Sequence, residues 1–75
     1  MEPFCLELIF KDGTKYTIYG SEEQMKNSYE ELSRELETEI KKTIKITGMI
    51  NTIEQKNCQM IFVIDSIMAV TYYKY

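Results

Sequence analysis

The strongest nucleophiles in this sequence are two cysteine thiols, Cys5 and Cys58. The chain has no histidine to activate them, and the nearest bases in sequence are carboxylates and lysines. The three glycines, at positions 13, 20 and 48, are scattered and form no phosphate-binding loop. We therefore expect no catalytic residues, and the sequence does not predict an enzyme. Both cysteines are expected to be reduced, structural thiols.

Metal chemistry has equally little support in the sequence. Zinc sites need Cys and His ligands at close spacing, and the two cysteines lie far apart in the chain. The pairs Glu31/Glu35 and Glu35/Glu39 stand four residues apart and could present oxygens to a hard cation. The more ordinary interpretation is the solvated face of a helix. We expect no bound metal and no cofactor.

The acidic residues are concentrated in one segment. Residues 22–39 hold seven Glu against Lys26 and Arg34, a balance of −5, so the remainder carries +2 of the net −3. An acidic chain is not expected to bind nucleic acid or an anionic membrane directly. The segment is either a solvated helix face or a phosphate-like surface that binds the basic groove of a DNA-binding protein, such as a host defence nuclease. The candidate partner-binding residues are Glu30, Glu31, Glu35 and Glu37.

The elements that position these side chains follow from the periodicity of the apolar residues. Residues 4–10 alternate with period two and predict a strand, which Asp12-Gly13 separates from a second strand ending at Tyr19. A two-residue loop would pair apolar with polar side chains. A three-residue loop with Gly13 in the left-handed conformation keeps the apolar face intact. It would pair Leu8 with Tyr16 and Leu6 with Ile18.

A helix is predicted behind the second strand. Ser21-Glu22-Glu23-Gln24 is typical of a capping box, with Ser21 as the N-cap and Gln24 reaching back to it. The acidic first turn and the lysines near position 41 suit the two ends of the helix dipole. The apolar stripe of this helix is expected to be Met25, Tyr29, Leu32, Leu36 and Ile40.

Strand periodicity returns from Ile44 and continues to Ile53, with Gly48 marking either a bulge or a close approach of another backbone. Residues 54–57 are polar and predict a turn. Residues 58–64 are apolar on both faces from Met60 onward, which is typical of a central strand. Asp65-Ser66 is either a hairpin turn or a bulge before a last strand over residues 67–73.

This order predicts a single domain over residues 1–75. It is an α+β fold, β-β-α-β-β with a further C-terminal strand, in which one helix packs on one face of an antiparallel sheet of four to five strands. The opposite sheet face stays uncovered, and a contiguous apolar face is typical of an interface. Strand addition at an unpaired edge is a further route to association. The candidate self-association residues are Ile9, Tyr19, Tyr72, Tyr73 and Tyr75.

The cellular setting is expected to be the cytoplasm. The sequence contains no apolar run long enough to span a bilayer, and Met1-Glu2-Pro3 lacks the basic start of a signal peptide. Ile and Lys are abundant whereas Ala, Arg, Gly and Pro are scarce, which favours an AT-rich genome of a low-GC bacterium, plasmid or phage.

The function favoured by these observations is that of a non-enzymatic interaction module, a regulator, adaptor or inhibitor that binds a protein partner or itself as a homodimer. One alternative is a small-ligand sensor with a pocket lined by Tyr16, Tyr29 and Met25. The other is a structural subunit of a larger assembly.

Overall fold

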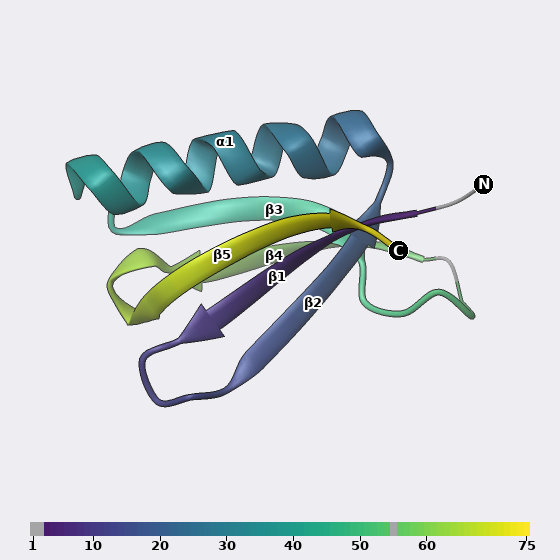
Figure 1. Ribbon diagram of the computed structural model, residues 1–75, viewed down its shortest axis with the longest axis horizontal. Coiled ribbons are helices and arrows are strands. Elements are labelled where there is room, and N and C mark those ends of the chain that lie inside the picture. Colours follow the sequence, from purple (N-terminus) through teal and green to yellow (C-terminus); the bar gives the residue numbers. More distant parts are fainter. Residues whose placement is uncertain (1–2, 55) are drawn as a thin grey trace.

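The computed structural model describes residues 3–54 and 56–75, and within them it contains five antiparallel strands and one α-helix (Figure 1). The α+β order β-β-α-β-β-β confirms the fold predicted from the sequence. The elements are β1 (Phe4–Phe10), β2 (Lys15–Gly20), α1 (Glu22–Thr38), β3 (Thr43–Met49), β4 (Asn57–Val63), the 3-10 turn η1 (Ile64–Ser66) and β5 (Ile67–Lys74).

The first hairpin has the register that its hydrophobic pattern requires. Leu8 pairs with Tyr16 and Leu6 with Ile18, so the three-residue loop is confirmed. Gly13 adopts φ +92°, a conformation that side chains with a Cβ rarely take. The Asp12 carboxylate fixes the loop by accepting hydrogen bonds from the Thr14 backbone N–H at 2.9 Å and from its hydroxyl at 2.7 Å.

The ladder order is β4-β3-β2-β1-β5, but β2 and β3 share only the pair Tyr19↔Met49. Phe62 is opposite Ile44, five residues along β3 from Met49. In a flat antiparallel sheet, Tyr16 and Ile44 would lie on opposite sides of the Tyr19↔Met49 pair. At about 3.4 Å per residue, Phe62 would then be more than roughly 20 Å from Tyr16. Their ring centroids are instead 5.4 Å apart. The sheet therefore folds back on itself at this one bridge.

Figure 1 shows the consequence, with β2 and β3 converging near the start of α1 and diverging toward η1. The β2-β1-β5 ladder and the β3-β4 ladder enclose one core, and Phe62 meets Phe10 and Tyr16 across it. The helix closes the open side by packing on β1, β3 and β5. The fully buried part of this core includes Leu6, Leu8, Ile18, Met25, Leu32 and Ile46.

The N-terminal end of α1 follows the expected cap, since the Ser21 hydroxyl accepts a hydrogen bond from the Gln24 backbone N–H at 3.1 Å. The C-terminal end comes earlier than predicted. Glu39 is the C-cap in the left-handed conformation, φ 56°, and Ile40 lies beyond it and is exposed. The buried stripe therefore stops at Leu36, and Ile40 was wrongly assigned to it.

Three predictions about the C-terminal half were wrong or incomplete. β3 ends at Met49 rather than Ile53, because the Asn51 side chain accepts hydrogen bonds from the backbone N–H groups of Ile53 and Glu54 and holds a turn. β4 is an edge strand, not a central one. Asp65-Ser66 belongs to η1, which links two strands at opposite ends of the ladder, so it is neither a tight hairpin nor a bulge. Gln55, in the predicted turn, lies outside the described residues.

Gly48 marks a close approach rather than a bulge, since the β3-β4 register runs through it without a shift. A Cβ at this position would collide with the Ile18 side chain and lie 3.0 Å from the Tyr19 carbonyl oxygen. Glycine thus permits the contact between β2 and β3 on which the fold of the sheet depends.

We expect Gly48→Ala to lower the free energy of unfolding by about 1–3 kcal/mol, since the added methyl group overpacks the contact with Ile18. The matched control is Thr47→Ala, at the neighbouring exposed position of β3, which should change stability by less than about 0.5 kcal/mol. Urea unfolding measures both. Equal stability of the two variants would contradict the close approach.

Candidate functional site

The four carboxylates proposed as a partner surface are divided between two sides of α1. Glu30 and Glu37 are exposed on the outside of the helix. Glu31 and Glu35 lie on its flank, where the Lys41 ammonium is 3.7 Å from one carboxylate and 3.8 Å from the other. Glu35 is only 5% exposed and also accepts a hydrogen bond from the Thr38 hydroxyl at 3.3 Å. The structure therefore does not bring the four residues together on one accessible surface.

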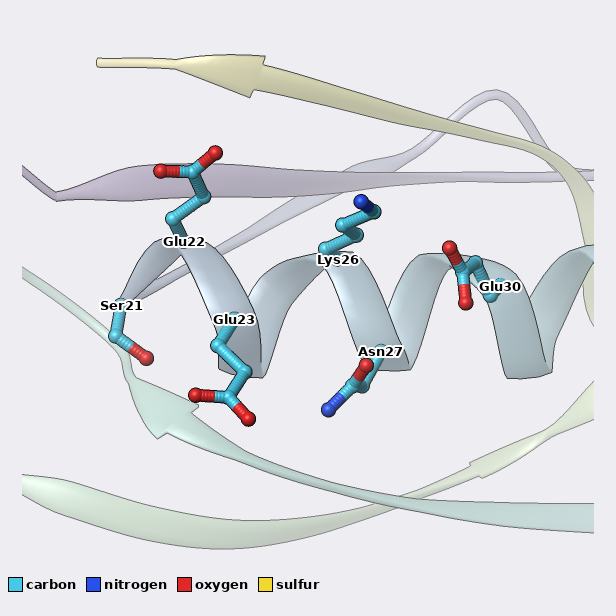
Figure 2. A pocket seen from close by; sticks show the side chains of 6 residues that line it. All are labelled: Ser21, Glu22, Glu23, Lys26, Asn27 and Glu30. Atoms are coloured by element: carbon cyan, nitrogen blue, oxygen red, sulfur yellow. The ribbon is translucent and has the colours of Figure 1, made fainter.

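The outer helix surface carries mixed charge. The exposed positions of α1 hold four Glu, one Lys and one Arg, a balance of −2 compared with −4 for all of α1. Figure 2 shows the first half of this surface, where the side chains spread outward from the ribbon and Lys26 lies between Glu22 and Glu30. This is a shallow solvated surface, so it resembles the ordinary helix face more than a continuous phosphate-like one.

Charge reversal at Glu35 is therefore expected to disturb the fold. Glu35→Lys would place two ammonium groups side by side at a nearly buried position, and we expect it to lower the free energy of unfolding by about 1–3 kcal/mol. Glu37→Lys is the exposed control and should stay within about 0.5 kcal/mol. Urea unfolding at neutral pH compares them, and a Glu35→Lys variant as stable as the control would contradict the pairing with Lys41.

The tyrosines proposed for self-association form two separate groups. Tyr19, Tyr73 and Tyr75 lie around Cys5 on the sheet face opposite the helix, and the Tyr19 and Tyr75 rings meet edge to face at 5.6 Å. Tyr72 points to the helix side, where it stacks on Phe4 at 5.6 Å and its hydroxyl donates to the Glu22 carbonyl at 3.4 Å. Tyr72 is thus part of the packing between sheet and helix.

The remaining candidate, Ile9, is half-buried and pairs with Lys15 and Ala69, on the same sheet face as Cys5. The first tyrosine group partly covers the sheet face that the sequence leaves bare. Tyr19 is half-buried against the Tyr75 ring, whereas Tyr73 and Tyr75 stay 41% and 65% exposed.

The two thiols lie on opposite faces of the sheet, because Cys5 pairs with Tyr19 whereas Cys58 pairs with Gly48 on the helix side. Both are free. Cys5 is 1% exposed, and burial raises the pKa of its thiol. A hydrogen bond with the Tyr73 hydroxyl opposes that pKa shift, and the Glu7 carboxylate reinforces it. Cys5 is therefore a protonated, covered thiol, poorly suited to nucleophilic chemistry.

We expect iodoacetamide at pH 8 to alkylate Cys58 at least about tenfold faster than Cys5 in the folded protein, because the raised pKa and burial both reduce the available Cys5 thiolate. Mass spectrometry of the digested protein measures the two rates. In urea the rates should converge, which serves as the control. Equal rates in the folded protein would contradict the shielding of Cys5.

The residues proposed to line a ligand pocket belong to the packed interior. Met25 is fully buried in the core. Tyr16 and Tyr29 pack against the edge of the core, the first on Phe62 and the second on Tyr72. The three side chains fill space between the helix and the sheet, and they contact different neighbours.

The most exposed large apolar side chains of the sheet lie on β4 and at the start of β5. Ile61 is 65% exposed, Val63 55% and Met68 61%. Ile61 and Val63 point away from the core on an edge strand. Met68 is extruded by the register shift between Ile9 and Phe10 on β1. We call these three residues the β4–Met68 strip.

Ile61 and Val63 were not among the candidate residues predicted from the sequence. The signal was present in the run that is apolar on both faces. That run was interpreted as a central strand, and only the ladder order shows that it lies at an edge.

Next to the strip, a groove separates the end of α1 from η1, with Leu36, Ile64 and Ile67 in it and Lys11, Lys41 and Lys42 at its rim. Lys11 also lies 3.6 Å from the Asp65 carboxylate. The groove joins the strip at Val63 and Met68, so apolar surface extends from the β4 edge to the helix.

Among residues 3–54 and 56–75, no cluster of three or more acidic or Cys side chains is placed to hold a metal ion. In the same part of the chain, the helix is too short and too polar to cross a bilayer. The chain matches none of the family models, curated proteins or solved structures with which it was compared.

Proposed function

We propose that the protein is a non-enzymatic interaction module that acts, as a regulator, adaptor or inhibitor, by occupying the surface of a protein partner. The observation that carries the proposal is the β4–Met68 strip. Large apolar side chains gathered on one side of a small domain are typical of an interaction site, since leaving them in water is unfavourable by roughly 1.5–3 kcal/mol for each side chain.

Backbone geometry adds to this argument. β4 is an edge strand, so one side of its backbone is available to an added strand. The helix packs chiefly on β5, β1 and β3, so it leaves β4 the least covered part of the sheet. Binding at this edge would therefore join main-chain hydrogen bonds to the burial of apolar side chains.

The acidic helix is a weaker candidate for the same role. Lys41 pairs with both carboxylates of its flank and offsets part of their charge, and the outer surface of the helix mixes both charges. Cytosolic partners suit the two free thiols, which do not persist readily in an oxidising compartment.

The test is affinity capture of proteins from the native cell extract, with quantitative mass spectrometry and two double variants. Ile61→Lys/Val63→Lys should reduce capture of the partner at least about tenfold, because charge is introduced where apolar surface is buried. Glu30→Gln/Glu37→Gln, on the exposed helix surface, should leave capture unchanged. Loss of capture in the helix variant alone would overturn the β4 assignment, and equal capture by all three proteins would overturn the site altogether.

A further inference from the structure

We infer that the β4 edge pairs with the β4 edge of a second copy of this chain, in an antiparallel and two-fold symmetric arrangement. The inference rests on the proposed function, because it names the occupant of the same apolar surface. Two sheets joined in this way would form one continuous ladder across the symmetry axis.

β4 carries none of the features that keep an edge strand from pairing. Native edges are protected by charged residues, prolines, bulges or a covering element. Residues 57–64 contain no charged residue and no proline. The ladder between β3 and β4 continues over seven residue pairs, from Thr43↔Val63 to Met49↔Asn57, without a register shift. β4 is thus a straight, uncharged edge.

The opposite edge provides a contrast within the same molecule. The ladder between β5 and β1 has a register shift at Met68, and β5 lies beside α1. The Tyr72 hydroxyl on β5 contacts the carbonyl of Glu22, in the acidic first turn of the helix. Two copies that met through β5 would bring their acidic helices close together. The protein therefore protects β5 and leaves β4 open.

The charge around β4 also favours pairing with a second copy. Residues 43–66 contain Lys45 and Lys56 against Glu54 and Asp65, a balance of zero, although the chain as a whole carries −3. A neutral surface can meet its own copy without repulsion, whereas the acidic helix cannot. Lys45 lies one strand inward, opposite Ile61. Three strand spacings, roughly 14 Å, would separate Lys45 from its symmetry mate, which exceeds the screening length of about 8 Å.

The sequence of β4 also permits a symmetric register. A two-fold axis perpendicular to the sheet keeps each residue on its own face, so paired positions must differ by an even number of residues. When the axis passes between the Ile61 residues of the two copies, these two side chains lie beside each other on the outer face. Met60 then lies opposite Phe62 of the second copy on the inner face. Both pairs are apolar, and both join side chains that are exposed or half-buried in one copy.

The experiment measures mass by light scattering and sedimentation, in reductant, over a concentration series up to about 1 mM. Reductant prevents a disulfide through Cys58 from being mistaken for the pairing. Ile61→Lys should raise the dimer dissociation constant at least about 100-fold, because each dimer loses the contact between its two Ile61 side chains and brings two ammonium groups together at the axis. The matched control is Thr71→Lys, at an exposed outer-face position of the other edge strand, and it should remain a dimer.

Amide hydrogen exchange tests the same inference without a mutation, so it does not depend on the variants folding. In the wild-type protein, protection of the β4 backbone N–H groups should rise with concentration while that of β5 stays constant. A monomer at every concentration would overturn the inference, as would a dimer that only Thr71→Lys dissociates or a dimer that neither variant affects.

These outcomes are separable from the test of the proposed function. A monomeric protein whose capture of a partner still depends on Ile61 and Val63 would overturn self-pairing alone, and would assign the edge to a strand of another protein. A monomer whose capture is the same in all variants would overturn both.

Discussion

The single pair between β2 and β3, Tyr19↔Met49, is the constraint on which the rest of the structure depends. With more pairs the five strands would form an open sheet, and one helix would have to cover all of it. With one pair, the two ladders fold toward each other and share a core that a 17-residue helix can close. Gly48 makes this possible by removing the side chain that would hold β3 away from Ile18.

The same fold of the sheet explains how strands at opposite ends of the ladder can be consecutive in sequence. η1 spans only Ile64–Ser66, so the end of β4 and the start of β5 must be near each other. Two backbone hydrogen bonds hold this corner, from Ile64 N–H to the Lys42 carbonyl and from Lys11 N–H to the Ser66 carbonyl, each at 2.9 Å. Both edge strands are fixed here, but only β5 continues beside the helix. The uncovered position of β4 is thus a consequence of the topology.

Features governed by neighbours in sequence could be predicted, and features governed by distant residues could not. The register of the first hairpin and the Ser21 cap each depend on a few adjacent side chains, and both are present in the structure. The nearly buried Glu35 carboxylate is paired with the Lys41 ammonium. Lys41 lies beyond Glu39, which ends the helix in a left-handed conformation. The β2–β3 bridge joins residues 30 positions apart, and no local pattern specifies it. The edge position of β4 depends on that bridge and was missed with it.

An apolar residue on the outer face of an edge strand adds little to the stability of an isolated chain, because most of its surface stays in water. Ile61 and Val63 face away from the core, and polar residues there would suit the same backbone, as Thr43, Thr47 and Gln59 show on neighbouring outer positions. In the tyrosine group around Cys5, by contrast, the buried Cys5 side chain is covered and the Tyr19 ring packs on Tyr75, although Tyr73 and Tyr75 stay 41% and 65% exposed. The buried core can be explained by folding, whereas the outer face of β4 is the surface for which we propose contact with another chain. The proposed interaction site is therefore placed at two aliphatic side chains on an uncharged strand rather than on the acidic helix.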